Sequence, residues 1–245
     1  MRQYSRIGLP DDVAAYLRKK QLEVDGGKDA RTTWEAARKT DKVARLIDTL
    51  QTMTGVRARC MYCEDSRGTD VDHFYPIVPY RDKTFVWLNM LLNCTDCGRH
   101  KTNDFPLDAG GDPLLIDPTS EDPWLSLFYD TRTGNLAARF DPRTGQPVPR
   151  GEKTLEALCE TLLCEAVVEG RRRTHRNLVR AVRTFMNAPN EAGSVTELSD
   201  AMRDNDAYGL TRWYVLRDGR DEAPFSELRA HFPGVWAELE GLVRG

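Results

Sequence analysis

The chain has 245 residues, of which 40% are hydrophobic and 30% charged, and its formal net charge is −3. This composition is ordinary for a globular protein of one or two domains with a sizeable core. The negative charge argues against a general polyanion binder, so nucleic-acid contacts should come from local basic patches. No apolar run is long enough to cross a bilayer, and the first residues lack the apolar core of a signal peptide. We therefore expect a cytoplasmic protein without membrane contact, in which thiols stay reduced.

The N-terminal region, residues 1–59, is predicted to be helical, with helices over residues 10–25 and 31–54. Asp11 or Asp12 can cap the first helix. Glycines interrupt the pattern between the two helices. The second helix has apolar residues near helical spacing, which indicates one buried face.

Two Cys-x-x-Cys pairs follow, with 30 residues between them. Each pair places two thiolates on one side of a tight turn, and together they complete the tetrahedral sulfur shell of a structural zinc site. Two disulfides or a redox pair are the alternatives. A four-sulfur site leaves no open coordination position, so no catalysis is expected at this metal. The expected Zn2+ ligands are Cys60, Cys63, Cys94 and Cys97.

Asp72 and His73 lie between the two cysteine pairs. On an extended segment, adjacent side chains point to opposite sides, so one can hold a metal while the other faces a water. A carboxylate suits Mg2+ or Mn2+, and a neutral imidazole suits proton abstraction near pH 7. A plain surface turn is the alternative, and the surrounding cysteines make it less attractive.

These motifs resemble the zinc-bound variety of the HNH endonucleases across residues 60–106. The resemblance rests on Asp72-His73-Phe74-x-Pro76, on Trp87-Leu88-Asn89, on the two cysteine pairs and on Lys101. It implies a small ββα-metal unit, in which a hairpin carries the Asp-His pair and a helix follows the Asn. The fold class expected for the whole chain is therefore α+β, with a zinc-stapled ββα core flanked by mainly helical regions.

The resemblance also implies a role for each motif residue. His73 resembles the general base that activates water, and Asp72 resembles the carboxylate ligand of a catalytic Mg2+ or Mn2+. Asn89 resembles the central Asn, whose amide ties the loop together and orients the His. Lys101 is a candidate contact to a substrate phosphate.

One position departs from the family pattern. The third motif residue, usually His or Asn, falls on Gly98, which has no side chain to ligate a metal. His100 is the nearest candidate, although two residues along a helix turn the side chain by about 200°. Asn103 is a weaker candidate. Without either residue, Asp72 would hold the cation with water and substrate phosphate, as Mg2+ tolerates.

The rest of the chain divides into an extension over residues 107–150 and a helical region over residues 151–245. Cys159 and Cys164 are expected to be buried free thiols in the helical region. Periodicity and turn signals predict the following elements: a strand at 114–116, a hairpin of 126–129 with 136–140, and helices at 152–186, 195–205 and 225–242.

Basic residues gather in two places. Six arginines and no acidic residue occur between Arg171 and Arg183. This segment is the strongest nucleic-acid patch outside the motif, and a docking surface for an acidic partner or a solvated face are the alternatives. Arg57 and Arg59, beside the first cysteine pair, can clamp phosphate or can be plain surface charge. The candidate contacts in the arginine-rich segment are Arg171, Arg172, Arg173 and Arg176.

The wider layout, over roughly residues 30–185, resembles the PtuB-like HNH proteins of retron- and Septu-type antiphage defence. That resemblance implies a DNA-cleaving effector that works with an ABC-type ATPase partner. A binding or assembly subunit with a degenerate centre is the alternative, and Gly98 favours it. An RNA-cleaving nuclease with the same centre is a further alternative.

Overall fold

The computed structural model describes residues 1–101 and 105–244. The α-helices are α1 (Asp11–Asp25), α2 (Ala30–Ala37), α3 (Asp41–Met53), α4 (Thr95–Lys101), α5 (Pro149–Leu162), α6 (Glu165–Asn187), α7 (Ser194–Asp204), α8 (Leu210–Leu216), α9 (Phe225–His231) and α10 (Pro233–Arg244). The strands are β1 (Asp70–His73), β2 (Met90–Asn93), β3 (Leu127–Tyr129), β4 (Leu136–Ala138), β5 (Phe140–Asp141) and β6 (Gln146–Pro147). Short 3-10 helices are η1 (Arg81–Lys83), η2 (Trp87–Asn89), η3 (Pro123–Leu125) and η4 (Asp218–Asp221).

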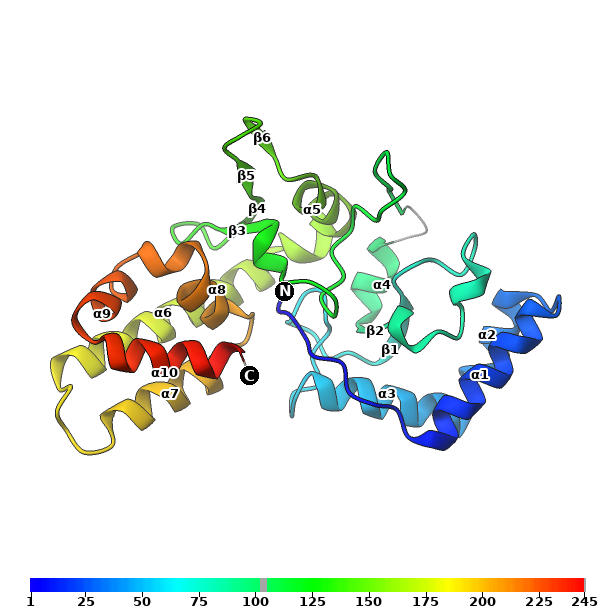
Figure 1. Cartoon of the computed structure of the whole chain (residues 1–245), viewed down its shortest axis with the longest axis horizontal. Coiled ribbons are helices and arrows are strands. Elements are labelled where there is room, and N and C mark those ends of the chain that lie inside the picture. The colour runs from blue at the N-terminus through cyan, green and yellow to red at the C-terminus, as the bar shows by residue number, and fades with distance from the viewer. Residues whose placement is uncertain (102–104, 245) are drawn as a thin grey trace.

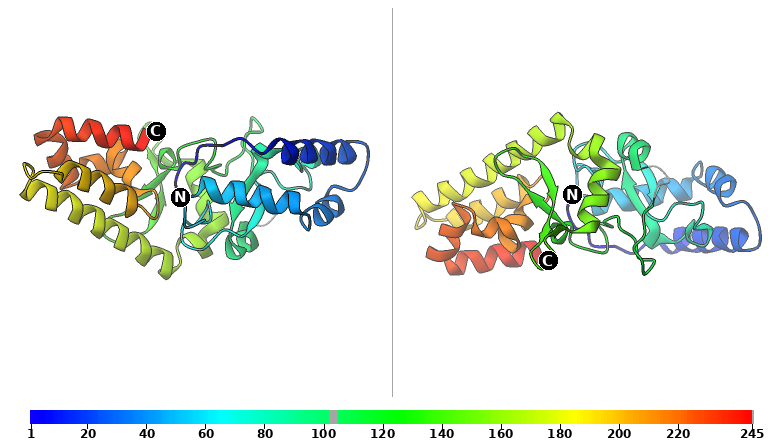
Figure 2. Two further views of the ribbon diagram at one scale, coloured as in Figure 1. Left: turned by 90° about the horizontal axis from the view of Figure 1, so that it is seen from below. Right: turned by 90° about the horizontal axis from the view of Figure 1, so that it is seen from above.

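The elements form two groups along an elongated molecule. Helices α1–α4 lie with β1 and β2 at one end, and helices α6–α10 lie at the other (Figure 1). Helix α5 and the strands β3–β6 lie between the two groups, as Figure 2 also shows from above and below. The strands form three separate antiparallel pairs. No described helix combines the length and apolarity that a membrane span requires. The chain is thus a mixed helical and antiparallel-strand protein.

The hairpin of β1 and β2 is central to the first group. Asp70 pairs with Asn93, and His73 pairs with Met90, in antiparallel register. Helix α4 begins two residues after β2 ends. The predicted hairpin that carries the Asp-His pair, and the predicted helix after Asn89, are both confirmed as local structure.

The N-terminal helices differ in detail from the prediction. Helix α1 is confirmed, but no side chain caps it, and Asp12 instead pairs with Lys42, 2.5 Å away, and with Arg45 of α3. The single helix predicted over 31–54 was wrong, because the chain is extended at Thr40 and separates α2 from α3.

In the middle of the chain, the predicted strand is absent and the predicted hairpin is confirmed. No strand forms at 114–116; Leu115 and Ile116 are buried in irregular backbone, where the Ile116 amide donates to Oγ1 of Thr154 at 2.9 Å. This hydrogen bond to a side chain takes the place of the backbone hydrogen bond that a neighbouring strand would provide. The predicted hairpin is present as β3 paired with β4, and β5 paired with β6 continues from it.

The C-terminal helices are more numerous than predicted. Extended backbone at Cys164 divides the helix predicted over 152–186 into α5 and α6. The helix predicted over 225–242 is divided into α9 and α10 at Pro233. A proline disfavours the helical conformation in the residue before it, here Phe232. Helix α8 was not predicted. Cys164 is half-buried and Cys159 is exposed, so the expected burial of these thiols was wrong. The core of this group is apolar and includes Leu178, Val182, Trp213, Tyr214, Phe225, Leu228 and Leu239.

Candidate functional site

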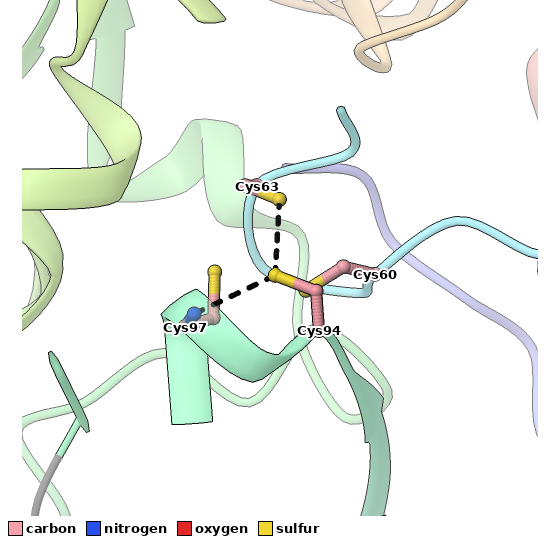
Figure 3. Close-up of side chains that lie close together, drawn as sticks. All are labelled: Cys60, Cys63, Cys94 and Cys97. Carbon is pink, nitrogen blue, oxygen red and sulfur yellow. Dashed lines mark hydrogen bonds between the residues drawn. The ribbon is translucent and has the colours of Figure 1, made fainter. Parts of the chain in front are cut away.

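Four cysteines converge at the base of the hairpin. Figure 3 shows their sulfurs turned toward one another: Cys60 and Cys63 lie in the loop before β1, Cys94 lies between β2 and α4, and Cys97 lies in α4. All four are buried, and their Sγ atoms lie within 4.8 Å of one another, with 3.9 Å between Cys63 and Cys94. A tetrahedral site with metal–sulfur bonds of about 2.3 Å separates its sulfurs by about 3.8 Å. The four cysteines can therefore hold a metal ion such as zinc: Cys60, Cys63, Cys94 and Cys97.

The electrostatics of this cluster also favour a cation. Burial raises the pKa of the Cys60 thiol well above its ordinary value, and the neighbouring sulfurs add to the effect. A thiolate at this position is poorly solvated and repels charge on the other three sulfurs. A coordinated dication removes that penalty, because it stabilises the deprotonated form of each ligand.

The N-terminal segment fastens the turn of the first cysteine pair. Glu64 follows this pair with a left-handed φ of 62°, and its side chain is almost wholly buried. Its carboxylate accepts hydrogen bonds from the Arg2 amide at 2.8 Å and from the Tyr4 hydroxyl at 2.7 Å. A buried carboxylate needs such partners, so residues 1–4 complete the structure around the cysteines.

His73 is oriented by the backbone of the loop that follows β1. Its Nε2 lies 2.8 Å from the carbonyl oxygen of Thr84, and its ring meets Trp34 edge-on with 4.5 Å between centroids. A carbonyl oxygen only accepts, so Nε2 carries the hydrogen and Nδ1 keeps a free lone pair. Burial lowers the pKa of His73 to about 4. The imidazole is therefore neutral at physiological pH and can accept a proton at Nδ1.

Asp72, the neighbour of His73, is held by two buried groups. Its Oδ2 accepts a hydrogen bond from the Tyr62 hydroxyl at 2.6 Å and lies 2.9 Å from Nζ of Lys101. Burial raises the pKa of Tyr62 well above its ordinary value, so the phenol stays protonated and donates. Within residues 1–101 and 105–244, these contacts all reach Oδ2 rather than Oδ1.

Lys101, predicted to contact a substrate phosphate, is buried and already engaged by groups of the protein. Its side chain is 3% exposed, and Nζ also donates to the carbonyl oxygens of His73 at 2.8 Å and Phe74 at 3.2 Å. A buried ammonium is tolerated because these groups replace its water. Lys101 thus joins α4 to the end of β1, and its side chain also borders the cavity that Asp72 and His73 line.

Asn89 has the loop-tying position expected of it. Its Oδ1 accepts from the Tyr75 amide at 2.7 Å, and its Nδ2 donates to the carbonyl oxygens of Tyr75 and Lys83, both at 3.0 Å. These three bonds join the two ends of the loop that presents the Thr84 carbonyl to His73. Asn89 thereby positions the imidazole indirectly.

Asp72 and His73 line a single cavity of about 150 Å³. Their side chains leave β1 on opposite sides, yet the loop and α4 enclose the space that both reach. Pro76, Ile77 and Val78 form its apolar part. Arg31 of α2 and Lys101 supply its positive charge. Sequence reasoning missed Arg31, because an exposed helical arginine carries no local signal of a distant cavity.

The structure does not bring His100 into this cavity, so its predicted ligand role is not supported. His100 is exposed on α4 and does not line the space beside Asp72. Among the described residues, the four cysteines are the one group of three or more suitable side chains close enough to share a metal ion. The α4 backbone therefore turns His100 outward, as its spacing from Gly98 implies. Asn103 lies outside the described residues.

The space beside Gly98 is filled by another amide. A Cβ on Gly98 would lie 2.5 Å from Nδ2 of Asn93. Asn93 pairs with Asp70 across the hairpin and so shares a face with Asp72. Its Oδ1 is buried without a hydrogen-bond partner among the described residues. A side chain at position 98 would therefore displace the amide of Asn93.

The predicted arginine patch on α6 is dispersed. Arg171 is 1% exposed and donates to the carbonyl oxygens of Gly134 and Leu162, so its predicted nucleic-acid contact was wrong. Arg172 and Arg176 both pair with Glu169, at 3.6 and 2.8 Å. Arg173 is exposed and lines a different cavity.

A scan against protein-family models finds no match for this chain. A search of curated proteins likewise finds no match. The site therefore has to be interpreted from its own geometry and from the motifs of the sequence.

Proposed function

We propose that the protein is a metal-dependent HNH endonuclease that hydrolyses DNA phosphodiester bonds. One observation carries the proposal: a hairpin–helix unit presents a neutral imidazole and a carboxylate, His73 and Asp72, to one cavity beside four converging cysteines. This pairing of a base with a hard oxygen ligand suits metal-assisted hydrolysis of a phosphodiester.

In this proposal His73 is the general base. The Thr84 carbonyl holds Nε2–H, and Nδ1 takes a proton from the attacking water. Asn89 keeps the loop closed, so the ring cannot turn away during the reaction. Arg31 lines the same cavity and can neutralise charge that develops on the phosphate.

The residues fit a catalytic cation through one carboxylate. Oδ1 of Asp72 is the atom that would hold it, and waters and phosphate oxygens would complete the shell, as is common for Mg2+. A bound Mg2+ or Mn2+ would polarise the scissile phosphate and stabilise the leaving oxygen. The Lys101 ammonium, 2.9 Å from Oδ2, keeps the carboxylate oriented toward the cavity.

We further propose that the cysteine cluster holds Zn2+ as a structural ion. Four sulfur ligands satisfy its tetrahedral preference and leave no position for a substrate. The hairpin strands have four residues each, too few to form a stable unit by strand pairing alone. The reduced thiols that such a site requires fit a cytoplasmic location.

Plasmid cleavage in the presence of Mg2+ or Mn2+ tests the nuclease proposal. Replacement of His73 by Ala should reduce the cleavage rate by about 10²-fold or more, because the proton acceptor is lost. His231→Ala, an exposed histidine on α9, is the matched control and should leave the rate unchanged. Equal cleavage by wild type and His73→Ala would contradict the proposal. Parallel assays with RNA decide between DNA and RNA as the substrate.

A nucleic-acid-binding or assembly subunit with a degenerate centre is the second candidate. Gly98 has no side chain, and the charge of Asp72 is already balanced by Lys101. This candidate predicts DNA binding without cleavage at every Mg2+ or Mn2+ concentration. The same plasmid assay, combined with a gel-shift measurement, separates the two candidates.

The sequence layout supports one further part of the proposal, namely an antiphage defence effector that acts with an ABC-type ATPase. The test is co-expression of this chain with an ATPase encoded beside its gene, followed by co-purification. Recovery of a stoichiometric complex is the expected result. Independent elution of the two proteins, or an isolated gene without such a neighbour, would contradict this part alone.

A further inference from the structure

A second polar cavity, of about 400 Å³, lies away from Asp72 and His73. It is bounded by the segment before the first cysteine pair, by α6 and by the residues that follow α7. The structure thereby joins two basic segments that are far apart in the sequence. The side chains that matter here are Arg57, Arg59, Arg173, Thr174, Asn177 and Tyr208.

The arginines of this cavity have guanidinium N–H groups without a partner in the described part of the chain. Arg57 and Arg173 are exposed and have no ion-pair partner in the described part of the chain. Arg59 uses Nη1 to bind the carbonyl oxygens of Glu64 and Asp65, at 2.8 and 2.5 Å. Its Nε is buried and has no partner among residues 1–101 and 105–244. Three guanidinium groups thus have donors left for a ligand.

Two acidic residues, Asp65 and Asp204, also line the cavity. Asp65 accepts a hydrogen bond from the Tyr208 hydroxyl at 2.6 Å. Asp204 is 77% exposed, and its carboxylate lies 4.0 Å from Nε of Arg203, a residue that does not line the cavity. The lining therefore has three arginines against two carboxylates, of which Asp65 is hydrogen-bonded to Tyr208 and Asp204 is turned largely to solvent.

We propose that this cavity binds a phosphorylated ligand of nucleotide size. The guanidinium fork matches the oxygens of a phosphate group. A volume of about 400 Å³ falls within the range of about 300–1,000 Å³ for small-ligand pockets. The amide of Asn177 and the hydroxyl of Thr174 add neutral polar groups beside the arginines. The phosphate can come from a free nucleotide or from a nucleotide unit of a nucleic acid, and nothing in the proposal requires cleavage at His73.

Binding measurements with the full chain test the proposal without added Mg2+ or Mn2+. Two probes are used. Binding of AMP is measured by isothermal titration calorimetry, and binding of a fluorescent single-stranded DNA 12-mer is measured by anisotropy at two salt concentrations. Arg57→Gln/Arg173→Gln should weaken binding of at least one probe tenfold or more. Arg18→Gln/Arg183→Gln removes the same charge from exposed positions elsewhere and should change binding less than twofold.

The outcomes separate the two sources of phosphate. Loss of AMP binding assigns a free nucleotide, and loss of DNA binding alone assigns a nucleic-acid unit. Arg57→Lys/Arg173→Lys keeps the charge but not the fork, so intermediate affinity is expected. Equal weakening by the two Gln pairs, or failure of wild type to bind either probe, would overturn the proposal. Unchanged thermal melting shows that each variant remains folded.

Discussion

The region around the four cysteines and the C-terminal helices are stabilised by different interactions. The first contains two four-residue strands and a seven-residue helix, and buried cysteines, carboxylates and amides hold them together. The second contains helices of up to 23 residues around aromatic and aliphatic side chains. Short elements bury too little apolar area to be stable alone. The comparison indicates that the region with the candidate chemistry combines the apolar side chains of β2 with polar contacts and with a cysteine cluster that can hold a metal ion.

Loss of the metal ion proposed for the cysteine cluster should have the largest effect, and only on the first region. Structural zinc contributes on the order of 10 kcal/mol to the folding of small sites. Cys94→Ser, or a strong chelator, should abolish hydrogen-exchange protection of β1 and β2 while the C-terminal helices keep theirs. Cys159→Ser, an exposed cysteine outside the cluster, is the control. If the amides of β1 and β2 stay protected from hydrogen exchange after metal removal, the two regions do not differ in their dependence on a metal ion.

Truncation of a core aromatic should have the next largest effect, and only on the second region. Trp213 is fully buried and its ring lies 5.4 Å from that of Tyr129 and 4.8 Å from that of Tyr214. Trp213→Ala should destabilise these helices by about 3–5 kcal/mol, because a cavity replaces the ring. Urea denaturation measures the loss, and the zinc content should stay unchanged. Leu88→Ala, at a side chain 64% exposed, should cost about 0.5 kcal/mol or less.

A smaller effect should appear as a pH dependence of the first region. The pKa of His73 falls from an ordinary 6.5 to about 4 on folding, chiefly because of burial. Between these values the unfolded chain binds the proton and the folded chain does not, so stability rises with pH. The contribution reaches about 3 kcal/mol above pH 6.5 and is lost as the pH falls toward 4. The difference in unfolding free energy between wild type and His73→Gln, followed from pH 4 to 7, measures it; a pH-independent difference would contradict the buried neutral imidazole.

Cysteine spacing predicted the cysteine cluster, and the resemblance to the HNH endonucleases implied the hairpin–helix unit around it. Cysteine spacing alone places two sulfurs on each turn, whereas the loop-tying role of Asn89 was implied by the resemblance and matches its hydrogen bonds to Tyr75 and Lys83. The position of Lys101 could not be predicted, because its burial depends on the carbonyl groups of His73 and Phe74 across the unit. The predicted nucleic-acid contact of Arg171 was wrong for the same reason, because an arginine-rich segment does not show which of its residues faces the core. The breaks at Thr40 and Cys164 likewise reflect tertiary packing that overrides helical periodicity.

The close approach of Asn93 to Gly98 has a consequence for the divergence of this protein. The two positions share one space, so a side chain at position 98 would have to move the amide of Asn93 out of its place. A relative that carries an amide on the helix at position 98 should carry a smaller residue on the strand at position 93. Paired replacement at these two sites would mark lineages in which this corner of the molecule was rebuilt.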